Sequence, residues 1–273
     1  MLRMLGHALN PSQSRPQPVR VWGMPLAPVT AASAVREIER MAESATPSNV
    51  ITANLNYAML CDSCSYLQEL NERASLIVAD GMPLVWASRG QLPERVAGSD
   101  LIYLVCEMAA RRDFGVYLLG GAPGVADEAG KRLQDRYPGL RIVGTSSPKL
   151  GGDEDPETIA TIQNIRRVKP QILITALSQP WGEIWLDRRL KQLGVPVALQ
   201  LGASMDFAAG RVRRSPRWMR RTGLEWLFRL ALEPKRLCRR YASNALFLLK
   251  AVFRTLTSEP IERPTPSHPR IRA

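Results

Sequence analysis

Histidine is almost missing from this chain. The 273 residues contain two histidines, His7 and His268, and both fall in terminal segments that the sequence predicts to be disordered. A Ser-His-Asp triad, histidine acid–base catalysis and histidine metal ligation are therefore not expected. A general base would have to be a carboxylate, with lysine, tyrosine or cysteine as the alternatives.

Cysteine is also scarce, with four residues at positions 61, 64, 106 and 238. This number and spacing do not suggest a disulfide framework. Cys61 and Cys64 form a C-x-x-C, a spacing that can bind metal or carry out redox chemistry. No second pair accompanies it and the surrounding residues read as a helix, so we interpret both as plain thiols.

Long apolar runs are missing. The longest candidate, residues 242–256, has 15 residues and contains Lys250 and Arg254, whereas a bilayer-spanning helix needs about 18 or more apolar residues. It reads as a helix lying in an interface, either a membrane surface or a subunit contact. Residues 1–20 are polar and rich in proline, without the apolar core of a secretory signal, so we expect a cytoplasmic location.

Acidic residues are nearly absent from one segment, residues 211–240. It contains eleven Lys/Arg against Glu225 and Glu233, and so accounts for nine of the chain's net twelve positive charges. Trp218, Trp226 and Tyr241 lie among or next to these charges. Cations interleaved with aromatic residues suit a surface of anionic phosphates, either lipid headgroups or a nucleic acid backbone.

The rest of the chain alternates short apolar runs with helical segments of 10 to 15 residues. Predicted strands at 49–54, 75–79, 115–119, 141–144, 171–176 and 195–201 are separated by predicted helices, which is typical of parallel βαβ units. We therefore predict an α/β fold with a Rossmann-like, mostly parallel sheet. The expected organisation is a disordered leader (1–18), an α/β core (19–210), a basic helical appendage (211–257) and a disordered tail (258–273).

Ligands of parallel sheets bind beyond the carboxyl ends of the strands. Asp80 follows an apolar strand there, where partial desolvation would raise its pKa toward that of a useful base; it could equally be a turn residue or a helix N-cap. The turn Gly120-Gly121-Ala122-Pro123-Gly124 could hold a diphosphate at a helix N-terminus, or could simply be a strand-to-helix turn. Asp153 and Asp155 spell a D-x-D that could hold a metal-bound nucleotide, although acids are common at helix starts.

Several motifs occur together in one order along the chain. They are ITANLNYAML, ADGMPLVW, RVAGSDL, YLLGGAPGVADEA, LGASMDFAAG and RRSPRWMRRTGLEWLFRLALEPKRLCRRY. In this order, from about Val19 to Tyr241, the chain resembles the WecG/TagA/CpsF glycosyltransferases. The resemblance implies a metal-free, inverting transfer of N-acetylmannosamine, its uronic acid or glucose from a UDP-sugar to a sugar on polyprenyl diphosphate, without a cofactor. It also implies a peripheral enzyme at the inner face of the bacterial cell membrane, whose helical appendage docks on the membrane and which can self-associate.

The resemblance also implies roles for individual residues. Asp80 matches the catalytic base, Thr52 and Asn54 match pocket residues, and Asp206 lies in a motif near the nucleotide sugar. The other residues expected to bind substrate are Gly120, Gly121, Gln179, Glu183, Arg211, Arg214, Arg217 and Arg221. The arginines expected at the membrane are Arg229, Arg236, Arg239 and Arg240.

One departure from the family pattern concerns the donor site. The family pattern at 178–183 is Gly-x-Pro-Lys-Gln-Glu, whereas this chain has Ser178-Gln179-Pro180-Trp181-Gly182-Glu183. The missing amide at position 182 would alter donor contacts, or Gln179 would replace it. Two other functions remain as alternatives: a basic nucleic-acid-binding protein, and a metal-dependent transferase that uses Asp153 and Asp155.

Overall fold

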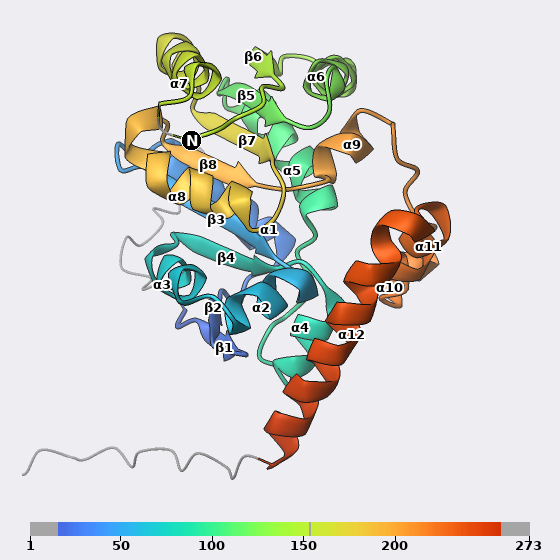
Figure 1. Cartoon of the computed structure of the whole chain (residues 1–273). Helices are drawn as coiled ribbons and strands as arrows, with labels where there is room; N and C mark the ends of the chain where they lie inside the picture. Colours follow the sequence, from blue (N-terminus) through green and yellow to red (C-terminus); the bar gives the residue numbers. More distant parts are fainter. Residues whose placement is uncertain (1–15, 153, 258–273) are drawn as a thin grey trace, which may run out of the picture.

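The structure is a computed structural model that describes residues 16–152 and 154–257 (Figure 1). A short antiparallel hairpin, β1 (Val19–Val21) and β2 (Met24–Leu26), comes first. The strands of the main sheet are β3 (Ser48–Ala53), β4 (Leu76–Ala79), β5 (Gly115–Gly120), β6 (Arg141–Ser146), β7 (Ile172–Ala176) and β8 (Val197–Gln200). Within the described residues these six strands form one sheet in the order β4-β3-β8-β7-β5-β6, and every neighbouring pair is parallel.

Helices cover both faces of this sheet (Figure 1). On one face lie α1 (Ala31–Ala42), α5 (Gly98–Arg111), α6 (Val125–Arg136) and α9 (Ser204–Ala208). The helices of the other face are α2 (Leu55–Asp62), α3 (Ser65–Arg73), α7 (Pro156–Val168) and α8 (Trp181–Leu193). The short α4 (Met82–Ala87) follows β4. The α/β fold with a Rossmann-like parallel sheet is therefore confirmed.

The strands are apolar on both sides, which is why they form a buried parallel sheet. In β3, Val50 packs with α1 and α5, while the next residue, Ile51, packs with α2 and α3. Ile172 and Leu173 of β7 divide in the same way between the two faces. Polar side chains such as Thr52 of β3 and Thr175 of β7 lie near the carboxyl ends of these strands.

Most predicted elements are present, with informative differences at the helix starts. Thr30 caps α1 in a capping box with Ser33. Helix α5 begins at Gly98, so that Ser99 lies within its first turn. Strand β2 and helix α9 were not predicted, since three and five residues are too short to show a period.

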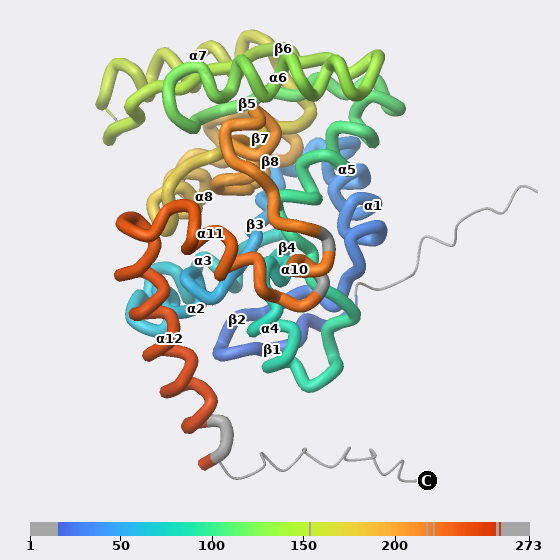
Figure 2. The backbone as a smooth tube through the Cα atoms, turned by 90° about the vertical axis from the view of Figure 1, so that its right-hand side faces the viewer, coloured from blue at the N-terminus to red at the C-terminus, as the bar shows by residue number. Residues whose placement is uncertain are grey.

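The appendage is helical, as the sequence predicts: α10 (Arg217–Arg221), α11 (Glu225–Leu232) and α12 (Pro234–Thr257). Helix α12 runs along one side of the molecule beside α2 (Figure 2). Phe247 and Ala251 are buried there, and the Phe247 ring lies 5.5 Å from that of Trp22 in the β1–β2 hairpin. In the described part of the chain no helix is both long and apolar enough to cross a membrane. Residues 1–15 of the predicted leader and the whole predicted tail lie outside the described residues.

Candidate active site

The polar residues predicted at the strand ends lie along one edge of the sheet. Asp80 follows β4, Asn54 follows β3, Asp206 lies beyond β8, Glu183 lies beyond β7, and Gly121 follows β5. Since the strands are parallel and the order is β4-β3-β8-β7-β5, these positions follow one another along the carboxyl edge. The helices of the appendage approach this edge from outside the sheet, as Figure 2 shows.

Asp80 is half-buried at the first position of this edge. Its backbone N–H donates to Ala53 O at 2.7 Å, which places it beside Asn54. Its carboxylate accepts a hydrogen bond from the backbone N–H of Gly98, at the start of α5. A methyl group at Gly98 would lie 2.9 Å from Ser204 Oγ and 3.4 Å from Asp80 Oδ2, so glycine is what allows α5, α9 and Asp80 to meet.

The surroundings of Asp80 raise the pKa of its carboxyl group. Burial raises its pKa to about 6, against the weaker lowering effects of the Arg95 charge and the Gly98 N–H. Among the side chains that the structure describes, Asp80 has no ion-pair partner. A carboxylate with a pKa near 6 is ionised at neutral pH and is a stronger base than an ordinary aspartate.

Thr52 and Asn54 use part of their hydrogen-bonding capacity within the fold. The Thr52 hydroxyl donates to Gln200 O at 3.0 Å, which ties β3 to β8. Asn54 caps α2, because its Oδ1 accepts from the Tyr57 N–H at 3.0 Å. Its Nδ2 group makes no hydrogen bond to any described residue and is half-exposed next to Asp80, so it can donate to a ligand.

The glycine-rich turn after β5 brings backbone donors and an arginine together. Gly120, Gly121 and Gly124 all have positive φ, and a Cβ atom on Gly120 would lie 2.8 Å from Ala176 O. The turn leads directly into the N-terminus of α6. Arg211 lies against it, with Nη2 donating to Pro123 O at 3.3 Å. A helix N-terminus with an exposed arginine beside it is chemically suited to a diphosphate.

Glu183 is a second buried carboxylate on this edge, only 2% exposed. Its Oε1 accepts from Gln179 Nε2 at 3.1 Å, and Gln179 Oε1 accepts from Asn56 Nδ2 at 3.3 Å. Its Oε2 has no hydrogen-bond partner among the described residues. Burial raises the pKa of Glu183 to about 7, and hydrogen bonding and the nearby charge of Arg240 offset only part of that.

Gly182 is a structural necessity in this chain. A Cβ atom there would lie 2.0 Å from Gln200 Nε2 and 2.7 Å from Leu177 Cβ. The Gln200 side chain is held in place by Thr175 Oγ1, which donates at 2.5 Å, and by donating to Leu177 O at 2.8 Å. An amide from β8 therefore occupies the space that a side chain at position 182 would need.

The appendage arginines fall into two groups. Some face inward: Arg214 donates to Asp100 Oδ1 at 2.8 Å and to Ser99, Arg229 lies 5.6 Å from the Phe207 ring, and burial lowers the pKa of Arg240. Burial also raises the pKa of Asp206, which the charges of Arg236, Arg229 and Arg211 oppose.

The second group faces outward. Arg239 is exposed, and Arg236 is exposed in a salt bridge to Glu233. The side chains of Arg217 and Arg221 lie outside the described part of the structure. The arginines predicted at the membrane are thus divided by exposure. Arg229 and Arg240 are partly buried, whereas Arg236 and Arg239 are exposed, although the charge of Arg236 still acts on Asp206.

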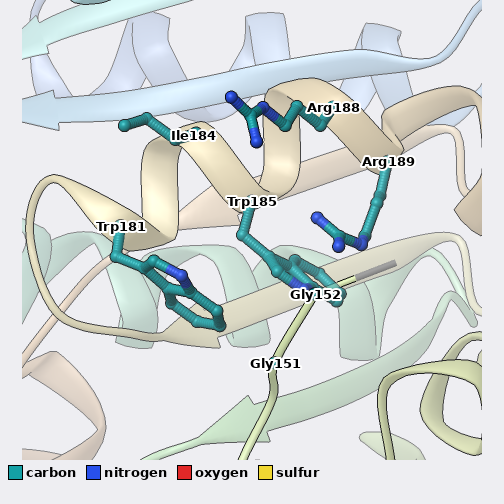
Figure 3. A pocket seen from close by; sticks show the side chains of 7 residues that line it. All are labelled: Gly151, Gly152, Trp181, Ile184, Trp185, Arg188 and Arg189. Atoms are coloured by element: carbon teal, nitrogen blue, oxygen red, sulfur yellow. The ribbon is translucent and has the colours of Figure 1, made fainter. Parts of the chain in front are cut away.

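A pocket of about 320 Å³ lies beside α8 (Figure 3). It is lined by one face of that helix and by a glycine pair in the loop after β6: Gly151, Gly152, Trp181, Ile184, Trp185, Arg188 and Arg189. The rings of Trp181 and Trp185 lie 6.3 Å apart. The pocket shares α8 with Glu183 but shares no lining residue with the surroundings of Asp80.

Asp155 has a structural role, and Cys61 is a buried thiol. Asp155 caps α7 by accepting from Thr158 N at 2.8 Å, while Asp153 lies outside the described residues. Within the described ranges no three metal-ligating side chains come together. Burial raises the pKa of the Cys61 thiol to about 11, so this cysteine is un-ionised at neutral pH.

Sequence reasoning did not single out several residues that the fold brings to this edge. Arg95 lies near Asp80, Asn56 supports Gln179, and Gln200 fills the space above Gly182. Arg95 does belong to a motif that the sequence showed, RVAGSDL. Asn56 likewise lies in the motif ITANLNYAML. Gln200 carries no local signal, because its position becomes meaningful only when β7 and β8 pair.

A doubly covered parallel sheet, with a carboxylate and a glycine-rich turn on its carboxyl edge, defines the class of α/β proteins that bind nucleotide-like ligands there. A sequence model of the glycosyl transferase WecG/TagA/CpsF family matches residues 19–260. The chain belongs to this family.

Two curated relatives carry the same name, N-acetylglucosaminyldiphosphoundecaprenol N-acetyl-beta-D-mannosaminyltransferase. The Bacillus subtilis (strain 168) protein is 30% identical over 166 residues, which are 60% of this chain and 63% of that protein. The Staphylococcus aureus (strain NCTC 8325 / PS 47) protein is 30% identical over 207 residues, 74% of this chain and 78% of that protein. The chain thus spans slightly less than two thirds of the first relative and over three quarters of the second.

Proposed function

We propose that this protein transfers a sugar from a UDP-sugar to a sugar carried on polyprenyl diphosphate, with inversion at the anomeric carbon. The observation that supports it most is Asp80, a half-buried carboxylate with a pKa raised to about 6 on the carboxyl edge of the sheet. The names of the relatives favour N-acetylmannosamine as the donor sugar and N-acetylglucosamine as the acceptor sugar.

In the proposed reaction, an acceptor hydroxyl oxygen attacks the anomeric carbon of the donor. Asp80 takes the hydroxyl proton, the new glycosidic bond forms, and the bond from the anomeric carbon to the β-phosphate oxygen breaks. The electron pair of that bond leaves with UDP. General-base catalysis of this kind contributes about 10²- to 10⁴-fold in rate.

The charge that develops on UDP requires stabilisation. Arg211, the N-terminus of α6 and the glycine turn supply donors on the same side of the sheet as Asp206. Arg229 and Arg240 approach from the appendage, close to Asp206 and Glu183 respectively. Preorganised cationic groups of this kind stabilise a departing diphosphate without a metal ion, so we propose Arg229 and Arg240 as part of the site.

The outward side of the appendage is suited to an anionic bilayer. Its exposed apolar side chains are Trp218, Trp226, Leu227, Leu232, Leu246, Leu249, Val252 and Phe253. Exposed basic residues, Arg213, Lys235, Arg239 and Lys250, lie among them. Each basic residue near an anionic leaflet contributes about 1 kcal/mol. We propose a peripheral position at the inner face of the cell membrane, where a polyprenyl-linked acceptor can be reached.

The reaction is tested by measuring UDP release from a panel of UDP-sugars with a short prenyl-diphosphate-linked N-acetylglucosamine acceptor. We expect turnover that depends on the acceptor and is fastest with UDP-N-acetylmannosamine. The UDP-linked uronic acid and UDP-glucose are the competing donors. Failure of every UDP-sugar to react would contradict the proposal.

Docking is tested by sedimentation with phosphatidylglycerol vesicles and, separately, with duplex DNA. The triple variant Leu246→Ser/Leu249→Ser/Phe253→Ser should reduce vesicle binding at least about tenfold, because it removes apolar area that would enter the interface. Ile159→Ser, which replaces an exposed apolar side chain on α7 by serine, is the control for a change outside the appendage. Binding to DNA in preference to vesicles would instead support the nucleic-acid-binding alternative.

A further inference from the structure

One ion pair joins the α/β core to the appendage next to Asp80. Arg95, in the segment before α5, places Nη1 3.0 Å from Oε2 of Glu225, the first residue of α11. Both side chains are largely buried, at 15% and 14% exposure. Ion pairs on an open surface contribute little to stability. In a pair that is largely buried, each charged group depends on the other, because separating them would leave a buried charge without a partner.

The same arginine is a neighbour of the proposed base. Val96 N donates to Ala79 O at 2.9 Å, so that Arg95 and Asp80 flank one backbone hydrogen bond. Arg95 is nevertheless paired with Glu225, and Asp80 is left with the Gly98 N–H. The charged groups that face Asp80 are Arg95 from the core and Glu225 and Arg229 from α11.

We propose that Glu225 is a positioning residue that holds Arg95 away from Asp80 and so keeps Asp80 available to accept the proton of the acceptor hydroxyl. When α11 is displaced, Arg95 loses Glu225 and pairs with Asp80 instead, and the base is occupied. The site is then competent only when the appendage is seated. This inference rests on the proposed function, because it needs Asp80 to be the base.

The physical basis is competition between two carboxylates for one guanidinium. An arginine binds one carboxylate best, through its planar fork of N–H donors. An opposite charge within about 4–6 Å lowers a carboxyl pKa by about 1 to 3 units. Arg95 already lowers the pKa of Asp80 and Glu225 already raises it. Removal of the Glu225 charge should therefore lower the pKa of Asp80.

Other ion pairs of the appendage provide an internal comparison. Asp100, in the first turn of α5, pairs with Arg214 at 2.8 Å and with Arg220 at 3.4 Å. These pairs also hold the appendage against the core, but neither Arg214 nor Arg220 is among the groups that act on Asp80. Asp100→Asn therefore removes a different ion pair between core and appendage and leaves the Arg95–Glu225 pair in place.

The test is the pH dependence of kcat/KM for Glu225→Gln in the full-length protein. The wild type should lose activity on acidification with an apparent pKa near 6. In Glu225→Gln this limb should move about one unit or more to lower pH, and the plateau should fall about tenfold. In Arg95→Gln/Glu225→Gln the limb should return to near pH 6, whatever the remaining rate. Asp100→Asn should leave the limb at its wild-type position.

A limb that stays at its wild-type pH in Glu225→Gln overturns the inference, even where the rate falls, because a merely structural contact lowers the rate without moving the limb. A limb that moves equally in Asp100→Asn overturns it too. Glu225→Asp, which keeps the charge but shortens its reach, gives a smaller shift in the same direction if Glu225→Gln does not fold. Asp80→Asn is measured alongside: full activity there refutes the proposed base itself, whereas an inactive Asp80→Asn with an unmoved Glu225→Gln limb refutes only the role of Glu225.

Discussion

Asp80 and Glu183 are two carboxylates on one edge of one sheet, and desolvation raises the pKa of both. Their surroundings differ. Glu183 is 2% exposed. Its Oε1 accepts a hydrogen bond from Gln179, which in turn accepts one from Asn56. Asp80 is half-exposed and takes one hydrogen bond, from a backbone N–H. A raised pKa therefore does not by itself identify a base, and access to the substrate separates the two acids.

The largest effect is expected from Asp80→Asn. The amide preserves the shape and cannot accept the proton, so kcat should fall about 10³-fold, within the range that a general base contributes. UDP release measures this, and circular dichroism checks that the fold is retained. Near-normal turnover in this variant would assign the base elsewhere, with Glu183 as the first alternative.

Glu183→Gln should have a smaller effect on catalysis, about tenfold in kcat/KM, because the amide can still hold Gln179. Its effect on stability has a definite sign. The folded-state pKa of Glu183, about 7, lies above the unfolded value near 4.3, so its stabilising contribution is complete below about pH 4.3 and is lost as the pH rises through 7. The free energy of unfolding of Glu183→Gln relative to wild type should rise by roughly 3 to 4 kcal/mol between pH 4.3 and pH 8, at about 1.4 kcal/mol per pKa unit. Thermal melts at several pH values measure this, and a pH-independent difference would contradict it.

Arg211→Ala tests the part of the carboxyl edge at the glycine turn, far along the sheet from β4 and Asp80. Loss of a charge-assisted contact to a diphosphate should raise KM for the donor about tenfold and leave the acidic limb of the pH profile in place. Arg213→Ala, two residues away and also exposed, is the matched control. Equal effects of both substitutions would mean that only overall charge matters.

The smallest effect is expected from Asp153→Asn/Asp155→Asn. Asparagine caps a helix nearly as well as aspartate, so α7 should persist and turnover should stay within about twofold of wild type. Activity should also survive a chelator. Loss of nucleotide binding in this variant would restore the metal-dependent alternative.

Much of the fold and part of the site could be predicted from local pattern. The apolar runs at 49–54, 75–79 and 171–176 predicted strands because buried parallel strands need apolar residues on both sides. Asp80 was singled out by its place directly after such a run, whereas Glu183 was named only through the family resemblance. The orientation of the arginines could not be predicted. Arg229 and Arg239 look alike in sequence, and only the seating of α11 and α12 turns one toward Phe207 and the other toward solvent. The pairing of Arg95 with Glu225 joins residues 130 positions apart, a distance at which sequence pattern carries no signal.

The contact between position 182 and Gln200 has an evolutionary consequence. Since a Cβ atom at position 182 would overlap the Gln200 amide, neither position can change freely while the other is kept. Family members that carry glutamine at position 182 should have a smaller residue at position 200, and the two positions should covary across the family.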